Sequence, residues 1–273
     1  MSVQQVSSTT TTEAPSITIA LPVWNEVASL ERLVGRSIAT LARIAPETGG
    51  EVLIVDDGST DGSAALADQL AERHAWVRAV HHPINRGYAD VQRSCYTHAL
   101  RDWVFLLPAD GQVDPEALFA LLREARHADL VVGIPGPGSE PPRWSSRAYH
   151  AVVTVLFGWR PWSRLGPCLL VRRSLVNRIQ LTARTPVCMT ELAARAERAG
   201  ATVRGVPIEL HRRESGKSAR RSLYAAIPRV LGELVTLRLR IGLDSMRGVS
   251  VLATPHSPAP ARATAAVDAG SAG

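Results

Sequence analysis

The chain has 273 residues, of which 45% are hydrophobic and 21% are charged, so it is long enough to bury a sizeable core and is neither fibrous nor wholly disordered. Its formal net charge of +6 favours anionic partners such as phosphates and acidic lipid headgroups. The three cysteines have no CxxC spacing and no nearby histidine pair, which argues against a zinc site or a disulfide framework and favours a reducing cytosol.

The two ends of the chain differ in composition from its middle. The start is rich in Ser and Thr and lacks the basic and apolar segments of a signal peptide, whereas the end is rich in Ala, Pro, Ser and Gly. No stretch approaches the roughly 20 apolar residues of a membrane span. These patterns predict disordered segments at 1–15 and 244–273, a folded domain at 16–221 and a helix at 222–243, in a protein that is neither secreted nor membrane-spanning.

Between these ends, short apolar runs alternate with segments of helical periodicity. The predicted strands are 17–21, 51–55, 77–81, 103–107, 130–133, 168–171 and 202–210. The predicted helices are 26–45, 61–74, 89–100, 114–126, 145–158, 187–199 and 222–243. The segment GIPGPGSEPP, which begins at Gly133, is predicted to be a loop. Apolar strands with crossover helices predict an α/β fold with a mostly parallel sheet, covered on both faces, whose ligand crevice lies at the carboxyl ends of the strands.

Polar clusters follow three of the predicted strands. They read PVWNE, DDGSTDGS and PADGQVDPE in chain order. In the second cluster Asp57 can accept hydrogen bonds from a base or a ribose, Gly58 permits a tight turn, and Asp61 can cap the next helix. The alternative is that this cluster is only a turn and a cap.

In this order, and together with NRGYA at 85–89 and RRESGKS at 212–218, these clusters resemble the signatures of family 2 GT-A glycosyltransferases, and among them the polyprenyl-phosphate (dolichol-phosphate) mannosyl- and glucosyltransferases. The resemblance spans about 16–222. It implies a GT-A, Rossmann-like fold. It also implies a glycosyltransferase that moves a sugar from a UDP- or GDP-sugar to an acceptor, polyprenyl phosphate in the first instance, by inverting displacement.

The resemblance also assigns roles around the donor. The implied nucleoside-binding residues are Pro22, Trp24, Glu26 and Asp57. The implied diphosphate-binding residues are Asp110, Gln112, Arg213 and Lys217. As the last Asp of a DxD motif, Asp110 would hold Mg²⁺ or Mn²⁺ and stabilise the leaving diphosphate; otherwise it is a turn residue. Pro108 stands where the first Asp of that motif is expected, so one carboxylate ligand is missing.

On the acceptor side, Arg147 matches an arginine that contacts the acceptor phosphate in the family. Glu191 matches an acidic position on a helix and would be a general base if the acceptor were an alcohol, or else a solvated helix residue. A phosphate acceptor, being anionic already, needs no base. Trp159 and Trp162 are interpreted as packing residues. The histidines without ligand spacing are His81, His82 and His211.

The sequence is also compatible with two other functions. One is transfer to a soluble alcohol acceptor, and the other is nucleotide-sugar binding with weakened catalysis, because Pro108 interrupts DxD. Nucleic-acid binding is disfavoured because the arginines are scattered and no aromatic-interleaved motif accompanies them.

The helix at 222–243 carries apolar residues at helical spacing with arginines between them. The stripe comprises Leu223, Ile227, Val230, Leu231, Leu234, Leu237 and Ile241. Such a stripe predicts either a peripheral contact with a membrane or packing against the catalytic domain. The expected location is therefore the cytoplasm, at the inner face of the membrane.

Overall fold

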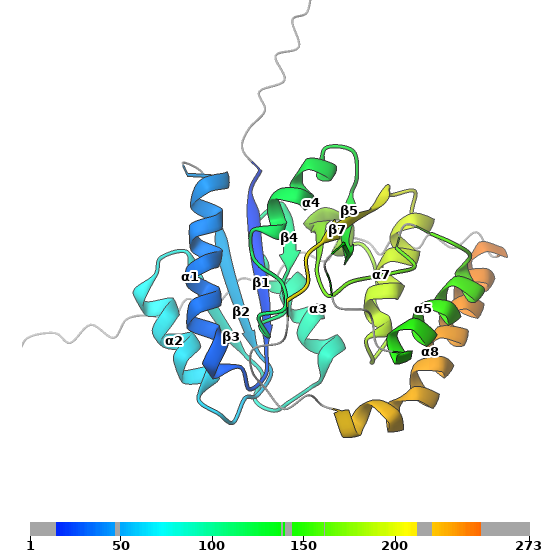
Figure 1. The fold of residues 1–273 in the computed structure, drawn as a ribbon, viewed down its shortest axis with the longest axis horizontal. Helices are drawn as coiled ribbons and strands as arrows, with labels where there is room; N and C mark the ends of the chain where they lie inside the picture. Colours follow the sequence, from blue (N-terminus) through cyan, green and yellow to red (C-terminus); the bar gives the residue numbers. More distant parts are fainter. Residues whose placement is uncertain are drawn as a thin grey trace, which may run out of the picture.

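The computed structural model describes residues 15–46, 50–137, 139, 144–160, 162–211 and 220–246. Its strands are β1 Ile17–Val23, β2 Glu51–Asp56, β3 Val77–His81, β4 Trp103–Leu106, β5 Leu130–Pro135, β6 Leu169–Arg172 and β7 Val203–Ile208. Its helices are α1 Val27–Ile44, α2 Ser63–Arg73, α3 Tyr88–His98, α4 Ala117–Ala125, α5 Trp144–Phe157, α6 Arg173–Val176, α7 Val187–Arg198 and α8 Arg220–Met246. All the strands belong to one sheet with the order β3-β2-β1-β4-β6-β5-β7 (Figure 1).

The sheet is mostly parallel. The parallel pairs are β1 with β2 and β4, β2 with β3, and β5 with β7. The strand β6 runs antiparallel between β4 and β5. The predicted α/β class and its mostly parallel sheet are therefore confirmed.

Both faces of the sheet are buried, which explains why its strands are apolar at successive positions. Val52 and Ile54 of β2 face a core cluster formed with α1, α2 and α4. The alternate residues Leu53 and Val55 face a second cluster formed with α3, α5, α7 and α8. In Figure 1, α1 and α2 lie together at one side of the molecule, and α5, α7 and α8 lie together at the other.

One strand is longer than predicted. β5 continues through Gly133 to Pro135, so the first three residues of the predicted loop are strand. A Cβ on Gly133 would lie 2.7 Å from Sγ of Cys168, which shows that the backbone of β5 passes close to the neighbouring chain because it carries no side chain there. The pairing continues beyond the proline, since the backbone N–H of Gly136 donates to the carbonyl of Ile208 at 2.8 Å.

The helix α8 packs against the domain. Leu234 and Leu237 are buried in the core cluster shared with α5 and α7, and Val230 and Ile241 pack against that cluster. Leu231 is 39% exposed. The side chains of Leu223 and Ile227 lie outside the described part of the structure, as do residues 1–14 and 247–273. Among the described helices, none is both long and apolar enough to cross a membrane.

Candidate nucleotide-sugar site

The loops after β1, β2 and β4 meet at the carboxyl edge of three adjacent strands. This edge is where ligands bind in open α/β sheets. In each loop the chain changes from a buried strand to a helix, so polar side chains and backbone N–H groups collect there. Hydrogen bonds then tie the loops to one another.

The loops after β1 and β2 are interlocked through Asn25. Its backbone N–H donates to Oγ of Ser59 at 2.9 Å, and its Oδ1 accepts from the backbone N–H of Thr60 at 2.7 Å. Asn25 adopts a left-handed conformation with φ of 57°, which a short polar residue tolerates better than most. These bonds hold the neighbouring Trp24 at the surface, where it is 46% exposed, between Pro22 and the buried Glu26.

Asp61 fastens the same junction from the other side. Its Oδ1 accepts hydrogen bonds from the backbone N–H and the hydroxyl of Ser63, at 3.0 and 2.6 Å. Its Oδ2 accepts from the backbone N–H of Val27, at 3.1 Å, in the first turn of α1. Burial opposes ionisation of this carboxyl, but the hydrogen bonds from Ser63 and Val27 outweigh it and lower its pKa. Asp61 is therefore an ionised carboxylate with a structural role, and it links the N-terminal ends of α1 and α2.

Asp57 lies buried where β2 ends, and it organises the segment after β3. Its Oδ1 accepts from the backbone N–H of Arg86 at 2.9 Å and lies 2.6 Å from Nδ1 of His82. Its Oδ2 accepts from the backbone N–H of Gly87 at 2.8 Å. A carboxylate offers about four lone-pair directions, so three of them are used within the protein. About one remains for a ligand.

The loop after β4 brings Asp110 to the same edge. Oδ1 of Asp110 accepts from the backbone N–H of Gln112 at 3.1 Å, which closes a tight turn around Gly111, where φ is 74°. The carbonyl of Ala109 accepts a hydrogen bond from the hydroxyl of Ser29 in α1 at 2.7 Å. The carbonyl of Gln112 accepts one from the backbone N–H of His211 at 2.8 Å. The chain after β7 therefore returns to the site beside Gln112.

Tyr88 is a further neighbour of this loop. It begins α3, is partly exposed, and directs its hydroxyl to Sδ of Met189 at 3.3 Å. Burial raises the pKa of the Tyr88 hydroxyl, and the nearby Cys188 and Asp110 raise it further. The hydroxyl therefore stays protonated, as a neutral hydrogen-bonding group between α3, α7 and Asp110.

Neither Tyr88 nor His82 is identified as a site residue from the sequence. His82 lacks the spacing of a metal ligand, but it is buried and bridges Asp57 and the hydroxyl of Ser94, which lies 2.8 Å from its Nε2. The missed signal was its position directly after β3, because β3 pairs with β2 and Asp57 directly follows β2. A spacing test for metal ligands does not detect a histidine whose partner is a carboxylate at the end of a neighbouring strand.

The acceptor-side candidates differ in accessibility. Arg147 is exposed on α5. Glu191 is fully buried: its oxygens accept hydrogen bonds from the backbone N–H of Thr182 and of Ala183, each at 2.8 Å, and it forms an ion pair with Arg195 at 2.8 Å. With its oxygens so occupied and no exposed surface, Glu191 is not a solvated helix residue, and in this conformation it offers no face to an acceptor. Arg213 and Lys217 lie outside the described residues.

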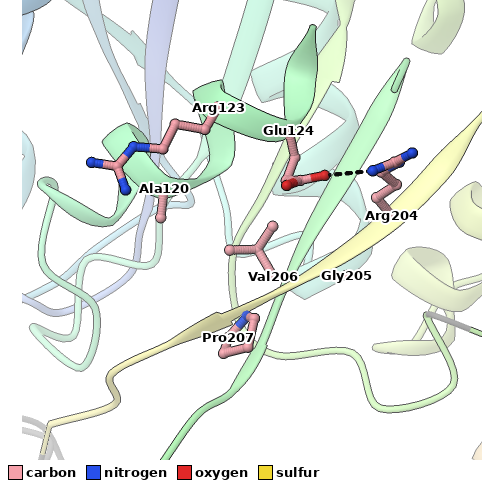
Figure 2. Close-up of a pocket in the computed structure, with 7 residues that line it drawn as sticks. All are labelled: Ala120, Arg123, Glu124, Arg204, Gly205, Val206 and Pro207. Carbon is pink, nitrogen blue, oxygen red and sulfur yellow. Dashed lines mark hydrogen bonds and ion pairs between the residues drawn. The ribbon is translucent and has the colours of Figure 1, made fainter. Parts of the chain in front are cut away.

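A surface pocket of about 490 Å³ lies elsewhere, between α4 and the outermost strand β7 (Figure 2). Glu124 and Arg204 line it and form an ion pair with each other at 2.8 Å. Its lining runs along β7 from Arg204 to Pro207 at one edge of the sheet, whereas the converging loops follow β1, β2 and β4, which β5 and β6 separate from β7. This pocket is therefore separate from the converging loops.

Several solved structures share this fold. Glucosyl-3-phosphoglycerate synthase from Mycobacterium tuberculosis, in complex with Mn²⁺, UDP and phosphoglyceric acid, superposes with a TM-score of 0.62 at 17% identity, covering 82% of this chain and 78% of that one. The same enzyme with Mg²⁺ and UDP gives a TM-score of 0.63 at 18% identity. These similarities confirm the GT-A type of fold.

Curated relatives are more similar in sequence. The undecaprenyl-phosphate 4-deoxy-4-formamido-L-arabinose transferase of Sodalis glossinidius is 34% identical over 149 residues, covering 54% of this chain and 45% of the relative. The undecaprenyl-phosphate mannosyltransferase of Micrococcus luteus is 34% identical over 128 residues, covering 45% of this chain and 50% of the relative. The chain therefore spans about half the length of these relatives.

The family model described as "Glycosyl transferase family 2" matches residues 18–180, which is more than half of the 273 residues. The matched region contains β1 to β6 and the three converging loops. By fold, by sequence and by the placement of its polar loops, the chain belongs to glycosyl transferase family 2.

Proposed function

We propose that the chain is an inverting glycosyltransferase that moves a sugar from a nucleoside-diphosphate sugar to polyprenyl phosphate. The observation that carries the proposal is the hydrogen-bonded convergence of three loops at one sheet edge, with Asp57, Asp110 and an exposed Trp24 among them. An acceptor oxygen attacks C1 of the sugar, the bond between C1 and the diphosphate oxygen breaks, and the nucleoside diphosphate leaves with the bonding electrons.

The donor half is proposed as follows. The aromatic face of Trp24 stacks beside the base, with Pro22 and Glu26 flanking it. Asp57 uses its remaining lone pair to accept one hydrogen bond from the nucleoside. Asp110 and Gln112 face the diphosphate, and Arg213 and Lys217, which lie in a segment outside the described residues, supply positive charge as it departs.

A divalent cation, Mg²⁺ or Mn²⁺, fits this site if the phosphates of a bound nucleotide supply further ligands. Among the described residues no three His, Cys, Asp or Glu side chains are grouped to hold a metal, so these side chains alone do not form a closed cage. Mg²⁺ commonly binds through one or two carboxylates together with substrate phosphates. Asp110 would hold the cation, which would neutralise charge on the leaving diphosphate. Pro108 leaves Asp110 as the one DxD carboxylate, so metal affinity should depend on bound nucleotide.

The acceptor is proposed to be a lipid phosphate because the site does not expose the candidate base. An alcohol acceptor must lose a proton as it attacks, and Glu191 is sealed by hydrogen bonds. A phosphate oxygen attacks without that help, and the exposed Arg147 is the proposed counter-charge. The names of the Sodalis and Micrococcus relatives include undecaprenyl phosphate, which supports this choice. A lipid acceptor places the chain at the inner face of the membrane, in peripheral contact with it.

A donor screen tests the proposal. Purified protein is incubated with UDP- or GDP-sugars, with and without polyprenyl phosphate, and release of nucleoside diphosphate is followed. The expected result is turnover that requires the added lipid and that falls in Asp110→Asn. Turnover with a soluble alcohol instead would identify the alternative acceptor class. Nucleotide binding without any turnover would identify a binding protein.

A further inference from the structure

A second surface lies on the opposite side of the molecule from α1 and α2, where α5 and α8 pack together (Figure 1). It carries large apolar side chains that the core does not cover. We call them the α5–α8 ridge: Val155, Trp159, Leu231, Val235, Leu239 and Leu243. Val155 is 84% exposed, Trp159 79% and Leu239 62%.

On α8, the ridge residues occupy a face of their own. They recur at every fourth position from Leu231 to Leu243, so they form one stripe along the helix. Leu234 and Leu237, which face the core, lie on a different side of the helix. The helix is therefore apolar in two directions, and only one of them is covered by the domain.

A pocket of about 390 Å³ opens beside the ridge, between the end of α5, α7 and α8. Phe157 and Trp162 supply its aromatic walls, and Arg160, Arg198 and Arg238 supply three positive charges against the single carboxylate of Glu197. That carboxylate accepts from Nε1 of Trp162 at 3.3 Å and lies 3.5 Å from Nη1 of Arg160. Arg238 donates through Nε to the carbonyl of Leu156 at 2.8 Å, which fixes its guanidinium at the pocket rim. The lining has two positive charges in excess.

The pocket is separate from the proposed donor site. Met189, near the start of α7, contacts Tyr88 of that site, whereas Arg198 at the end of α7 lines the pocket. Nine residues of α-helix separate these two positions, which corresponds to roughly 14 Å. An anion in the pocket would therefore not be the diphosphate of the donor.

We propose that this pocket binds the phosphodiester headgroup of an anionic phospholipid while the α5–α8 ridge enters the interfacial layer of the bilayer. The exposed Arg229 and Arg240 lie on the far border of the stripe from Arg238, so cations flank it on both sides. Apolar side chains bordered by arginines are the pattern of a helix that lies in a membrane surface. The proposal rests on the proposed function in one respect: binding to the membrane would keep the chain beside a lipid acceptor.

Vesicle co-sedimentation of the full chain tests the proposal. Phosphatidylcholine vesicles are compared with vesicles that also contain phosphatidylglycerol, at low and high salt. We expect binding to the anionic vesicles at low salt, weakened by salt. Arg160→Gln and Arg238→Gln should each lower that affinity about fivefold, as expected for one cation near an anionic surface. Leu239→Ser with Leu243→Ser should abolish it. The matched controls on other faces, Arg123→Gln and Ile84→Ser, should leave it unchanged.

A second readout does not depend on variant stability. Bromine-labelled lipids should quench tryptophan emission of the wild-type protein, and the quenching should fall in Trp159→Phe. If the ridge variants lose vesicle binding but the arginine variants keep it, the pocket does not bind the headgroup. If the protein binds inorganic phosphate but no vesicles, the ligand of the pocket is not a phospholipid. Ridge-dependent dimers that do not bind vesicles would also overturn the proposal. Vesicle binding in a protein that shows no transfer in the donor screen would instead refute the proposed function and leave this surface standing.

Discussion

His82 and Asp57 form a buried pair, with Nδ1 of the imidazole 2.6 Å from Oδ1 of the carboxylate. An ionised carboxylate can only accept, so Nδ1 carries the proton, and in the neutral imidazole Nε2 then accepts from the Ser94 hydroxyl at 2.8 Å. The histidine thus connects α3 to the end of β2. It also fixes the orientation of the carboxylate that we propose as a nucleoside ligand.

The first prediction concerns this pair. His82→Ala should raise the dissociation constant for the nucleotide on the order of tenfold, because Asp57 loses a charge-assisted hydrogen bond and its preferred rotamer. His82→Asn retains an N–H near the position of Nδ1 and should recover much of the affinity. His98→Ala removes an exposed histidine of α3, the helix that carries Ser94, as a control. Calorimetric titration measures all three. Equal affinity in His82→Ala and the wild type would show that His82 does not position Asp57.

Gly58 and Gly62 provide a matched pair for the second prediction. Both have positive φ, of 68° and 94°. A Cβ on Gly58 would lie 2.6 Å from the carbonyl carbon of Ile84 and 2.7 Å from the nitrogen of Asn85, whereas a Cβ on Gly62 has only Val27 near it, at 3.9 Å.

Gly62→Ala should therefore lower the free energy of unfolding by about 1 kcal/mol, the cost of left-handed backbone alone. Gly58→Ala should lower it further and weaken nucleotide binding, because the segment that donates to Asp57 must move. Urea unfolding and nucleotide titration check both effects. Equal losses in the two variants would contradict the close approach at Gly58.

The third prediction separates structure from catalysis at Glu191. Glu191→Ala leaves Arg195 and two loop N–H groups without their acceptor and should destabilise the fold on the order of 3 to 5 kcal/mol. Glu124→Ala, which breaks an exposed ion pair, should cost less than about 1 kcal/mol. Thermal unfolding measures both. A stable Glu191→Gln variant without turnover would restore the glutamate as a base.

The fourth prediction concerns the metal. Because Asp110 is the remaining carboxylate of the motif, the wild type should need high Mg²⁺ or Mn²⁺ for full turnover. Pro108→Asp adds a second oxygen ligand and should lower the half-saturating metal concentration on the order of tenfold. Activity against free metal concentration is the measurement. Tight binding of Mg²⁺ by the wild type without nucleotide would contradict it.

The fifth prediction concerns the three buried cysteines. Burial raises the pKa of Cys168 and of Cys188 to about 12, and it raises that of Cys95 well above its ordinary value. The thiolate is the reactive form, so a thiol reagent at neutral pH should label the native protein slowly and the unfolded protein fully. The unfolded thiols ionise near pH 9.0 and the folded ones do not, so stability should fall as pH rises above that value toward 12. Rapid labelling of the native protein would contradict this burial.

The sheet was predictable from sequence because strands buried on both faces are apolar at successive positions, as in VLIV of β2. The end of β5 was not predictable from the sequence, because Gly133 and Pro135 disfavour a strand locally. Pairing with β7 holds these two residues in the strand. The loops at the site were also recognisable, because turns between strands and helices need particular polar residues and glycines. The hydrogen-bond partners of those residues were not recognisable from the sequence. The contact of Asp57 with His82 and the burial of Glu191 depend on packing between distant segments.

The helix α8 supplies Leu234 and Leu237 to a core cluster that also contains residues of β1. This core cluster therefore cannot be completed until most of the chain has been synthesised. A nascent chain can assemble the four strands from β1 to β4 as soon as residue 106 has left the ribosome, because those strands follow one another along the chain. One edge of β4 then stays open until β6 is made, at residues 169–172, and the part of the core cluster that α8 shares with α5 and α7 stays incomplete until residue 237. We expect protease to spare the first three strands in ribosome-bound chains of intermediate length and to cut freely after β4, with protection of the whole domain appearing only when α8 has emerged.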